Sequence, residues 1–151
     1  ILRLVNIYGP RHQMKYSYGI VNYFIMQALS GKPITIMGTG KIQRDLLFVD
    51  DACDAFVECA ENPSTDGEIF NLGSGRGVSF IELANEIKNA TNCRVDLVGY
   101  TKIEKQLEPG DFVADITKIK KLTSWKPKTS LDGGIKKTID FYKKNKKHYW
   151  Q

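Results

Sequence analysis

The sequence predicts an α/β fold, because short apolar strands alternate with helices along most of its length. The apolar run at residues 1–7 is typical of a strand, and apolar side chains recur at helical spacing from residue 20. No internal repeat or low-complexity linker divides the sequence. With 151 residues, 42% hydrophobic and 26% charged, it can form one sizeable core, as a single domain or two small lobes.

In the first half of the chain, glycine and proline mark where elements end. Gly9 and Pro10 end the first strand, and Asp50 or Asp51 is well placed to cap a helix. The strands on either side of the turn at residues 38–40 are expected to form a small hairpin-like unit. The predicted elements are a strand over 1–7, a helix from 19 to the break at 31–33, strands over 33–37 and 45–49, and a helix through 60 that ends at 62–63.

The second half continues the same alternation. Ser79 and Glu82 have the spacing of a capping box, which predicts that a helix starts there. The other predicted elements are a strand over 69–72, a loop over 73–77, a strand over 94–98, a short helix over 115–122 and a long basic helix that begins with 131–142.

Charge and composition exclude several classes of function. The net charge is +5, but many of the lysines gather toward the C-terminus without a nucleic-acid motif, so we expect a solvated face and no nucleic-acid partner. A positive field of this kind can also attract a phosphorylated small molecule. No window approaches the ~18 apolar residues of a membrane span, which favours a cytoplasmic protein without a membrane partner.

Metal binding is not expected. Cys53, Cys59 and Cys93 are widely spaced, and His12 and His148 have no ligand partner at metal-binding spacing. We interpret the cysteines as free thiols in a reducing compartment.

Polar residues near strand ends are the candidates for binding. Asn6 and Asn71 each lie at the end of a predicted strand, where ligands usually bind in open α/β sheets, so a shared cleft is plausible. Arg44 lies at the edge of an apolar strand, where its guanidinium must either pair with a carboxylate, such as neighbouring Asp45, or bind an anion. The residues alone do not decide between these two alternatives.

The loop at residues 73–77 resembles phosphate-binding loops only superficially. It has neither the Gly-Lys-Ser/Thr ending nor the dinucleotide-binding spacing, which favours a simple tight turn. We find no nucleophile with a base and no paired carboxylates in an apolar run, so we assign no catalytic residue. From its own residues, the chain is expected to bind an anion.

Several blocks in order resemble the C-terminal half of the NAD-dependent sugar-nucleotide epimerases and dehydratases, which belong to the extended short-chain dehydrogenase/reductase family. They cover nearly the whole chain: Arg3-Leu-Val-Asn-Ile-Tyr-Gly-Pro-Arg11, Arg44-Asp-Leu-Leu-Phe-Val-Asp-Asp51, Phe70-Asn-Leu-Gly-Ser-Gly75, Pro109-Gly-Asp111 with Asp115, Trp125-Lys-Pro127 and Leu131-Asp-Gly-Gly134. The resemblance implies the C-terminal part of an extended Rossmann-type fold, with the last sheet strands and a small α/β substrate-binding lobe. We expect residues 1–151 to be that portion of a larger protein, whose N-terminal NAD-binding Rossmann domain lies outside this chain.

The resemblance also implies the residues of a nucleotide-sugar site. Asn6 would contact the substrate near its phosphates, and Arg44 would hold the diphosphate. Thr35 and Met37 would line the nucleobase pocket, with Val21 as a weaker member of the same wall.

NAD is the implied cofactor, bound mainly by the absent domain, and the backbone around Leu4 and Val5 would border its nicotinamide.

One position departs from the family pattern. Many members have a second diphosphate-binding arginine before the Pro-Gly-Asp block, where this chain has Glu108, whose carboxylate would repel a diphosphate. A nearby cation such as Lys105 could substitute, the substrate could differ, or the chain could belong to a subgroup without this arginine.

For the intact protein, the resemblance implies 4-epimerisation of a nucleotide-diphosphate sugar through a 4-keto intermediate. The alternatives are 4,6-dehydration or decarboxylation through the same intermediate, a non-catalytic binding or interaction module, or nucleic-acid binding by the lysine-rich helix, which salt would weaken steeply. We expect the 151-residue chain alone to be inactive, and the intact protein to form a homodimer through the absent domain.

Overall fold

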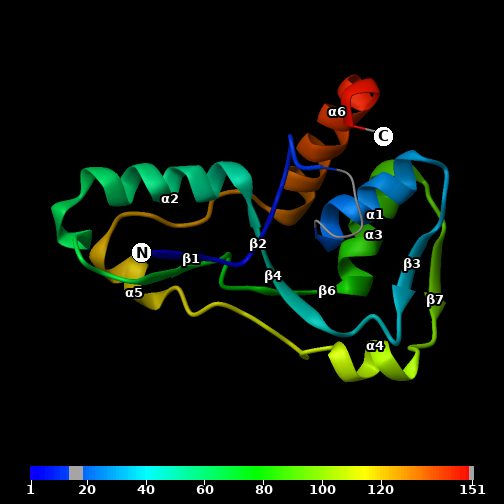
Figure 1. Cartoon of the computed structure of the whole chain (residues 1–151). Coiled ribbons are helices and arrows are strands. Elements are labelled where there is room, and N and C mark those ends of the chain that lie inside the picture. Colours follow the sequence, from blue (N-terminus) through cyan, green and yellow to red (C-terminus); the bar gives the residue numbers. More distant parts are fainter. Residues whose placement is uncertain (14–18, 150–151) are drawn as a thin grey trace.

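The computed structural model describes residues 1–13 and 19–149, and it confirms the α/β fold in the form of three small sheets. Two lobes lie on either side of a central strand pair (Figure 1). The central sheet has the order β2-β4-β6, with β2 parallel and β6 antiparallel to β4. Its strands are β2 (Asn6–Tyr8), β4 (Gln43–Phe48) and β6 (Gly77–Ser79).

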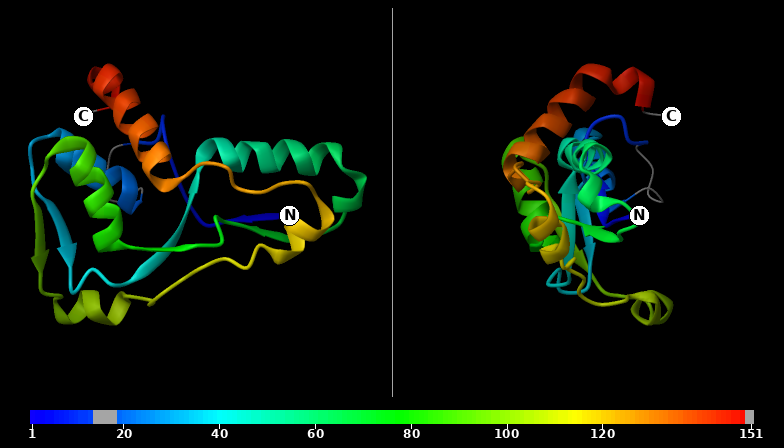
Figure 2. Two further views of the ribbon diagram at one scale, coloured as in Figure 1. Left: turned by 180° about the vertical axis from the view of Figure 1, so that it is seen from behind. Right: turned by 90° about the vertical axis from the view of Figure 1, so that its left-hand side faces the viewer.

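The larger lobe is a parallel strand pair covered by helices. β3 pairs with β7 along its whole length, and α1 and α3 pack against this pair and against α6 (Figures 1 and 2). The lobe contains α1 (Ile20–Leu29), β3 (Ile34–Met37), α3 (Phe80–Thr91), β7 (Val95–Val98) and α6 (Leu131–Tyr149), and α4 (Lys102–Leu107) follows β7.

The smaller lobe is built around a second parallel pair, β1 with β5. α5 packs against β5, and the longer helix α2 runs along the same lobe (Figure 1). The elements are β1 (Leu2–Leu4), α2 (Val49–Glu61), the short 3₁₀ helix η2 (Pro63–Thr65), β5 (Phe70–Leu72) and α5 (Thr117–Leu122).

β4 connects the two hydrophobic cores. Successive side chains of a strand point to opposite faces, so Leu46 and Phe48 enter the core of the larger lobe while Leu47 enters that of the smaller lobe. All three side chains are buried. The uninterrupted apolar run in the sequence is therefore a strand that is buried on both faces.

The predicted hairpin-like unit at residues 33–49 is wrong. β3 does not pair with β4: its partner is β7, about sixty residues later in the chain, and β4 pairs with β2 and β6. Gly38 and Gly40 both have a φ of 69°, and they turn the chain out of one sheet toward another. The predicted turn at residues 38–40 is confirmed, but the pairing of the strands on either side of it depends on residues that are distant in sequence.

The structure differs from the sequence-based expectations at three other places. The strand predicted over 1–7 is two strands, because the chain changes sheet at Val5, whose N–H donates to the Leu72 carbonyl at 3.1 Å. β6 and α4 were not predicted. α2 begins at Val49, so neither Asp50 nor Asp51 is its N-cap. Both lie in its first turn, where a carboxylate interacts favourably with the positive end of the helix dipole. By contrast, the predicted helix start at Ser79 is confirmed, since Ser79 Oγ accepts the Glu82 N–H at 3.2 Å, while the Glu82 carboxylate pairs with Arg76.

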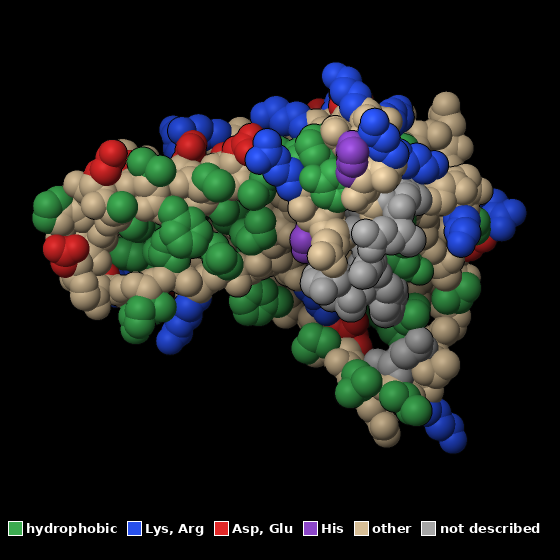
Figure 3. Space-filling model, turned by 45° about the horizontal axis from the view of Figure 1, so that its top comes forward, with side chains coloured by type: hydrophobic (Ala, Val, Ile, Leu, Met, Phe, Trp, Pro, Cys, Tyr) green, Lys and Arg blue, Asp and Glu red, His purple; other side chains and the backbone are tan. Residues whose placement is uncertain are grey.

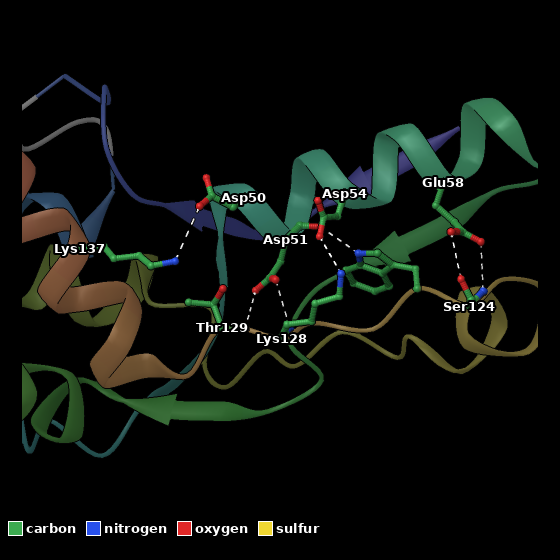
Figure 4. Close-up of polar contacts among 9 residues, drawn as sticks. Asp50, Asp51, Asp54, Glu58, Ser124, Lys128, Thr129 and Lys137 are labelled. Carbon is green, nitrogen blue, oxygen red and sulfur yellow. Dashed lines mark hydrogen bonds and ion pairs between the residues drawn. The ribbon is translucent and has the colours of Figure 1, made fainter.

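Asp51 and its neighbours hold the segment that leads into α6 (Figure 4). The buried Asp51 carboxylate accepts the backbone N–H groups of Lys128 and Thr129 at 3.1 and 3.0 Å. The indole of Trp125 donates to the Asp51 carbonyl at 2.9 Å, and Glu58 accepts both the N–H and the hydroxyl of Ser124 at 3.1 Å. The acidic face of α2 thus fixes the path of a segment that has no regular structure of its own.

Asp45 is the most deeply buried acidic side chain of the central sheet, with none of its surface exposed. Its carboxylate accepts the N–H and hydroxyl of Ser74, both at 2.6 Å, the N–H of Gly75 at 3.0 Å and the N–H of Ala114 at 3.1 Å. A Cβ at Gly73 would lie 2.3 Å from Asp45 Oδ2, so that position has no room for a side chain. This carboxylate ties β4 to the loop after β5 and to the strand-like segment around residue 114.

Tyr142 fastens α6 to the loop that follows β2. Its hydroxyl accepts the Asn22 amide N–H at 3.0 Å and donates to the His12 carbonyl at 2.5 Å. Burial raises the pKa of Tyr142 to about 12, and burial together with nearby Asp51 raises the pKa of Tyr8.

Membrane-spanning helices are absent from residues 1–13 and 19–149, because no helix there is both long and apolar enough to cross a bilayer.

We predict that Asp45→Asn lowers the free energy of unfolding by about 3 kcal/mol, because an amide cannot accept all of these hydrogen bonds in a buried site. Asp54→Asn is the matched control: Asp54 is exposed and pairs with Lys128 Nζ at 3.0 Å, so its replacement should cost less than about 1 kcal/mol. Urea unfolding followed by circular dichroism measures both. Equal losses in the two variants would contradict the role given to Asp45.

We also predict a loss of stability at alkaline pH. A tyrosine pKa that is higher in the folded than in the unfolded state stabilises the fold below about pH 10, and this contribution of about 2 kcal/mol is lost as the pH rises to about 12. Urea unfolding at pH 9, 10 and 11 should show a shallower decline for Tyr142→Phe than for the wild type. Parallel declines would show that other groups cause the loss.

Candidate functional site

A cavity of about 360 Å³ lies in the larger lobe beside β3 and α1. Its walls are mostly aromatic and aliphatic, with one carboxylate. They include Tyr23, Phe24, Thr35, Met37, Phe80 and Glu108. Pockets of this size and composition, mostly apolar with a few polar groups, are typical binding sites for small organic ligands.

Strand alternation places the two residues predicted for a nucleobase wall. Ile34 and Ile36 are almost fully buried in the core, and Ile36 also borders the cavity, while Thr35 and Met37 are only half-buried and line it. Thr35 and Met37 therefore lie together on one cavity wall, and the nucleobase role that the resemblance implies for them stays a prediction. The aromatic residues Tyr23, Phe24 and Phe80 complete the wall, and sequence reasoning missed them as cavity residues. The helical periodicity marked the apolar positions of α1, but not which of them face a cavity.

Arg44 adjoins this cavity at the start of β4. Its guanidinium pairs with the carboxylate of Glu108 and lies 5.4 Å from the centre of the Phe80 ring. It also donates to the Gln43 carbonyl at 2.9 Å and to the Gly110 carbonyl. The side chains of Arg44 and Glu108 are 14% and 19% exposed, so the pair is largely withdrawn from water.

The alternative in which Arg44 pairs with Asp45 is wrong. Adjacent residues of β4 point to opposite faces, and the Asp45 carboxylate is surrounded by the N–H groups of Ser74, Gly75 and Ala114. The loop at residues 73–77 does bind an anion through its backbone, but that anion is a side chain of the same protein.

Glu108 is held beside Arg44 by the segment that follows α4. Its carboxylate accepts the Gly110 N–H at 3.2 Å, and Asp111 accepts the Gln43 N–H at 2.8 Å. Phe112 then pairs with β4 at Arg44. Lys105, considered as a substitute cation, lies exposed on α4.

Asn6 and Val21 line a second, smaller cavity of about 180 Å³. Val21 therefore lies with Asn6 and does not line the cavity of Thr35 and Met37. Ile20 lines both cavities, so the two are neighbours across the start of α1. The Asn6 amide donates to the Asp45 carbonyl at 3.1 Å, which fixes the side chain against β4.

Asn71 does not join Asn6 in a shared cleft. It lies on β5 opposite Arg3, in a different sheet from Asn6, and its amide reaches the Asp115 carbonyl at 3.5 Å. The two strand ends look equivalent in sequence, but they belong to different sheets.

Leu4 and Val5, the residues predicted to border a cofactor, lie where the chain passes from β1 to β2. Val5 is half-buried against the core of the smaller lobe, whereas the Leu4 side chain is 46% exposed. Among the described strands, β1 pairs only with β5, so its other edge is open. Hydrophobic side chains also gather over the α2 side of the molecule, where Phe56 and Val57 are exposed (Figure 3).

The groups around the larger cavity can bind a ligand with a planar apolar part and a nearby anionic part. Aromatic rings and a thioether suit a ring system, and a guanidinium suits phosphate or carboxylate oxygens. Within residues 1–13 and 19–149, no cluster of His, Cys, Asp and Glu side chains is suited to a metal ion.

Comparison with known proteins shows which family the chain is similar to. The family model described as "NAD dependent epimerase/dehydratase family" matches residues 1–73. UDP-glucose 4-epimerase of Mycolicibacterium smegmatis is 34% identical over 91% of the chain, and UDP-N-acetyl-alpha-D-glucosaminuronate decarboxylase of Bacillus cytotoxicus is 32% identical over 95%. The crystal structure of UDP-glucose 4-epimerase with UDP-glucose from Thermotoga maritima superposes with a TM-score of 0.83 at 32% identity, over 95% of the chain. The chain spans 43%, 46% and 45% of these three proteins, less than half of each.

Proposed function

We propose that this chain is the nucleotide-sugar-binding, C-terminal portion of an enzyme of the NAD-dependent epimerase/dehydratase family, which the similarities to that family support. The observation that carries this proposal is the apolar cavity with a guanidinium at its edge. The similarity covers nearly all of the chain but less than half of its relatives, which supports a role for the chain as one part of a larger catalytic unit.

In this proposal, the cavity holds the nucleoside. The base would lie between the aromatic side chains of α1 and the Thr35–Met37 wall. Its flat faces are weakly hydrated, so their transfer from water to this apolar cavity would cost little free energy. Arg44 would hold the diphosphate, since its forked guanidinium matches phosphate oxygens. Asn6, beside the neighbouring cavity, would then contact the ligand between its phosphates and its sugar.

NAD is the proposed cofactor, and Leu4 and Val5 are the residues of this chain that would border it. An exposed leucine at the open edge of β1 fits contact with the flat face of a nicotinamide. When bound, NAD would supply reversible oxidation of the hexose at C4. The residues of this chain would hold and orient the nucleotide sugar, and the catalytic groups and most cofactor contacts would come from an N-terminal Rossmann domain.

We propose 4-epimerisation as the reaction of the complete enzyme. The similarity to UDP-glucose 4-epimerases supports it. The similarity to a decarboxylase at nearly the same identity supports the alternative in which the 4-keto intermediate is decarboxylated, and the family also includes dehydratases. The residues that separate these outcomes would act on the sugar, beyond the part of the ligand that this cavity would hold.

We predict that the 151-residue chain binds UDP, and that Arg44→Gln weakens this binding at least about tenfold while uridine binding changes little, because only the phosphates contact the guanidinium. Isothermal titration calorimetry measures both ligands. Arg76→Gln removes the same charge from an exposed residue that pairs with Glu82 and should leave both affinities unchanged. Absence of saturable UDP binding, or equal effects of the two variants, would overturn the proposal.

A further inference from the structure

The guanidinium at the edge of the larger cavity already has an anionic partner. Glu108 pairs with Arg44, and Arg44 also donates to the carbonyls of Gln43 and Gly110. The pair is largely buried, so its mutual attraction is screened less than that of an exposed pair. The positive charge that a phosphate would need is therefore compensated within the protein.

Glu108 is also better placed than Arg44 to meet a ligand. Glu108 is part of the cavity wall, whereas Arg44 adjoins the cavity through Glu108 and Phe80. An anionic ligand in the cavity would meet a carboxylate first, and like charges in a poorly hydrated site repel strongly. A phosphate can reach Arg44 only if Glu108 gives up its contact.

The surrounding backbone allows such an exchange. Asp111 and Phe112 fasten the segment to β4 beyond Glu108, and Gly110 provides a turn at φ 82° between the anchored residues and Glu108. On the other side of Glu108, α4 projects from the body of the larger lobe (Figure 2). The exchange breaks two contacts of the Glu108 carboxylate, the pair with Arg44 and the 3.2 Å hydrogen bond from the Gly110 N–H. The Arg44 contacts with two backbone carbonyls do not involve that carboxylate, so they can hold the guanidinium while the carboxylate moves away.

We propose that Glu108 competes with the ligand's phosphates for Arg44 and thereby sets the charge preference of the site. This inference rests on the proposed function, because it takes the cavity to be the nucleotide site. The carboxylate occupies Arg44 in the free protein and leaves it when a diphosphate binds. The site then depends on the base for much of its affinity and discriminates weakly between ligands with different numbers of phosphates.

The opposite role for Glu108 is that of a positioning residue, which holds Arg44 in the orientation that binds phosphate. The two roles predict opposite effects of removing the carboxylate. If Glu108 competes, Glu108→Gln strengthens phosphate binding, and if it positions Arg44, the same change weakens it.

The test is calorimetric titration of the 151-residue chain with UDP, uridine monophosphate and uridine. We expect Glu108→Gln to bind UDP about tenfold more tightly than the wild type, to gain less with the monophosphate and to bind uridine unchanged. Glu108→Ala should show the same order of effects, and Glu68→Gln is the control, because it removes the same charge from an exposed pair with Lys118 in the smaller lobe. Unchanged uridine binding and unchanged thermal melting show that each variant is folded.

The outcomes separate this inference from the proposed function. If the wild type binds UDP and Glu108→Gln binds it equally or more weakly, the competition is refuted while the nucleotide site stands. If neither the wild type nor any variant binds UDP or uridine, the proposed function fails and the inference fails with it. A gain shared by Glu68→Gln would also overturn the inference, because it would then reflect net charge alone.

Discussion

The buried carboxylate of Asp45 is the constraint on which the rest of the structure depends. It accepts four hydrogen bonds from the loop after β5 and from residue 114, and none of its surface is exposed. A buried charge is tolerable only when it is fully hydrogen-bonded, so these segments cannot shift independently. The carboxylate therefore joins the central sheet to the smaller lobe.

The same constraint fixes the candidate site, because Arg44 is the residue directly before Asp45 on β4. With Asp45 held on one face of β4, Arg44 must point to the other, toward Phe80 and Glu108. The central sheet also carries Leu46 and Phe48 into the larger core and Leu47 into the smaller one. A single strand of six residues thus sets both the packing of the two lobes and the direction of the Arg44 guanidinium beside the larger cavity.

The two lobes differ in how well they cover their apolar surface. In the larger lobe, α1, α3 and α6 enclose a core around β3, and the cavity lies within this frame. In the smaller lobe, Leu4, Phe56 and Val57 are exposed and one edge of β1 is open. Exposed apolar side chains beside an unpaired strand edge are typical of an interaction surface, which agrees with the proposed role of this lobe beside a cofactor-binding domain.

By itself, the sequence determined the class of fold, most of the helices and strands, and the Ser79 cap. Each of these depends on spacing within a few residues, either the period of a strand or helix or a local hydrogen bond. The tertiary structure alone decided that β3 pairs with β7, that Val21 lies with Asn6, and that Arg44 faces Glu108 rather than Asp45. Arg44 and Glu108 are 64 residues apart, and strand partners here are also distant, so no local pattern could identify them. Those contacts form only when the whole chain buries its apolar surface and pairs its buried charges at the same time.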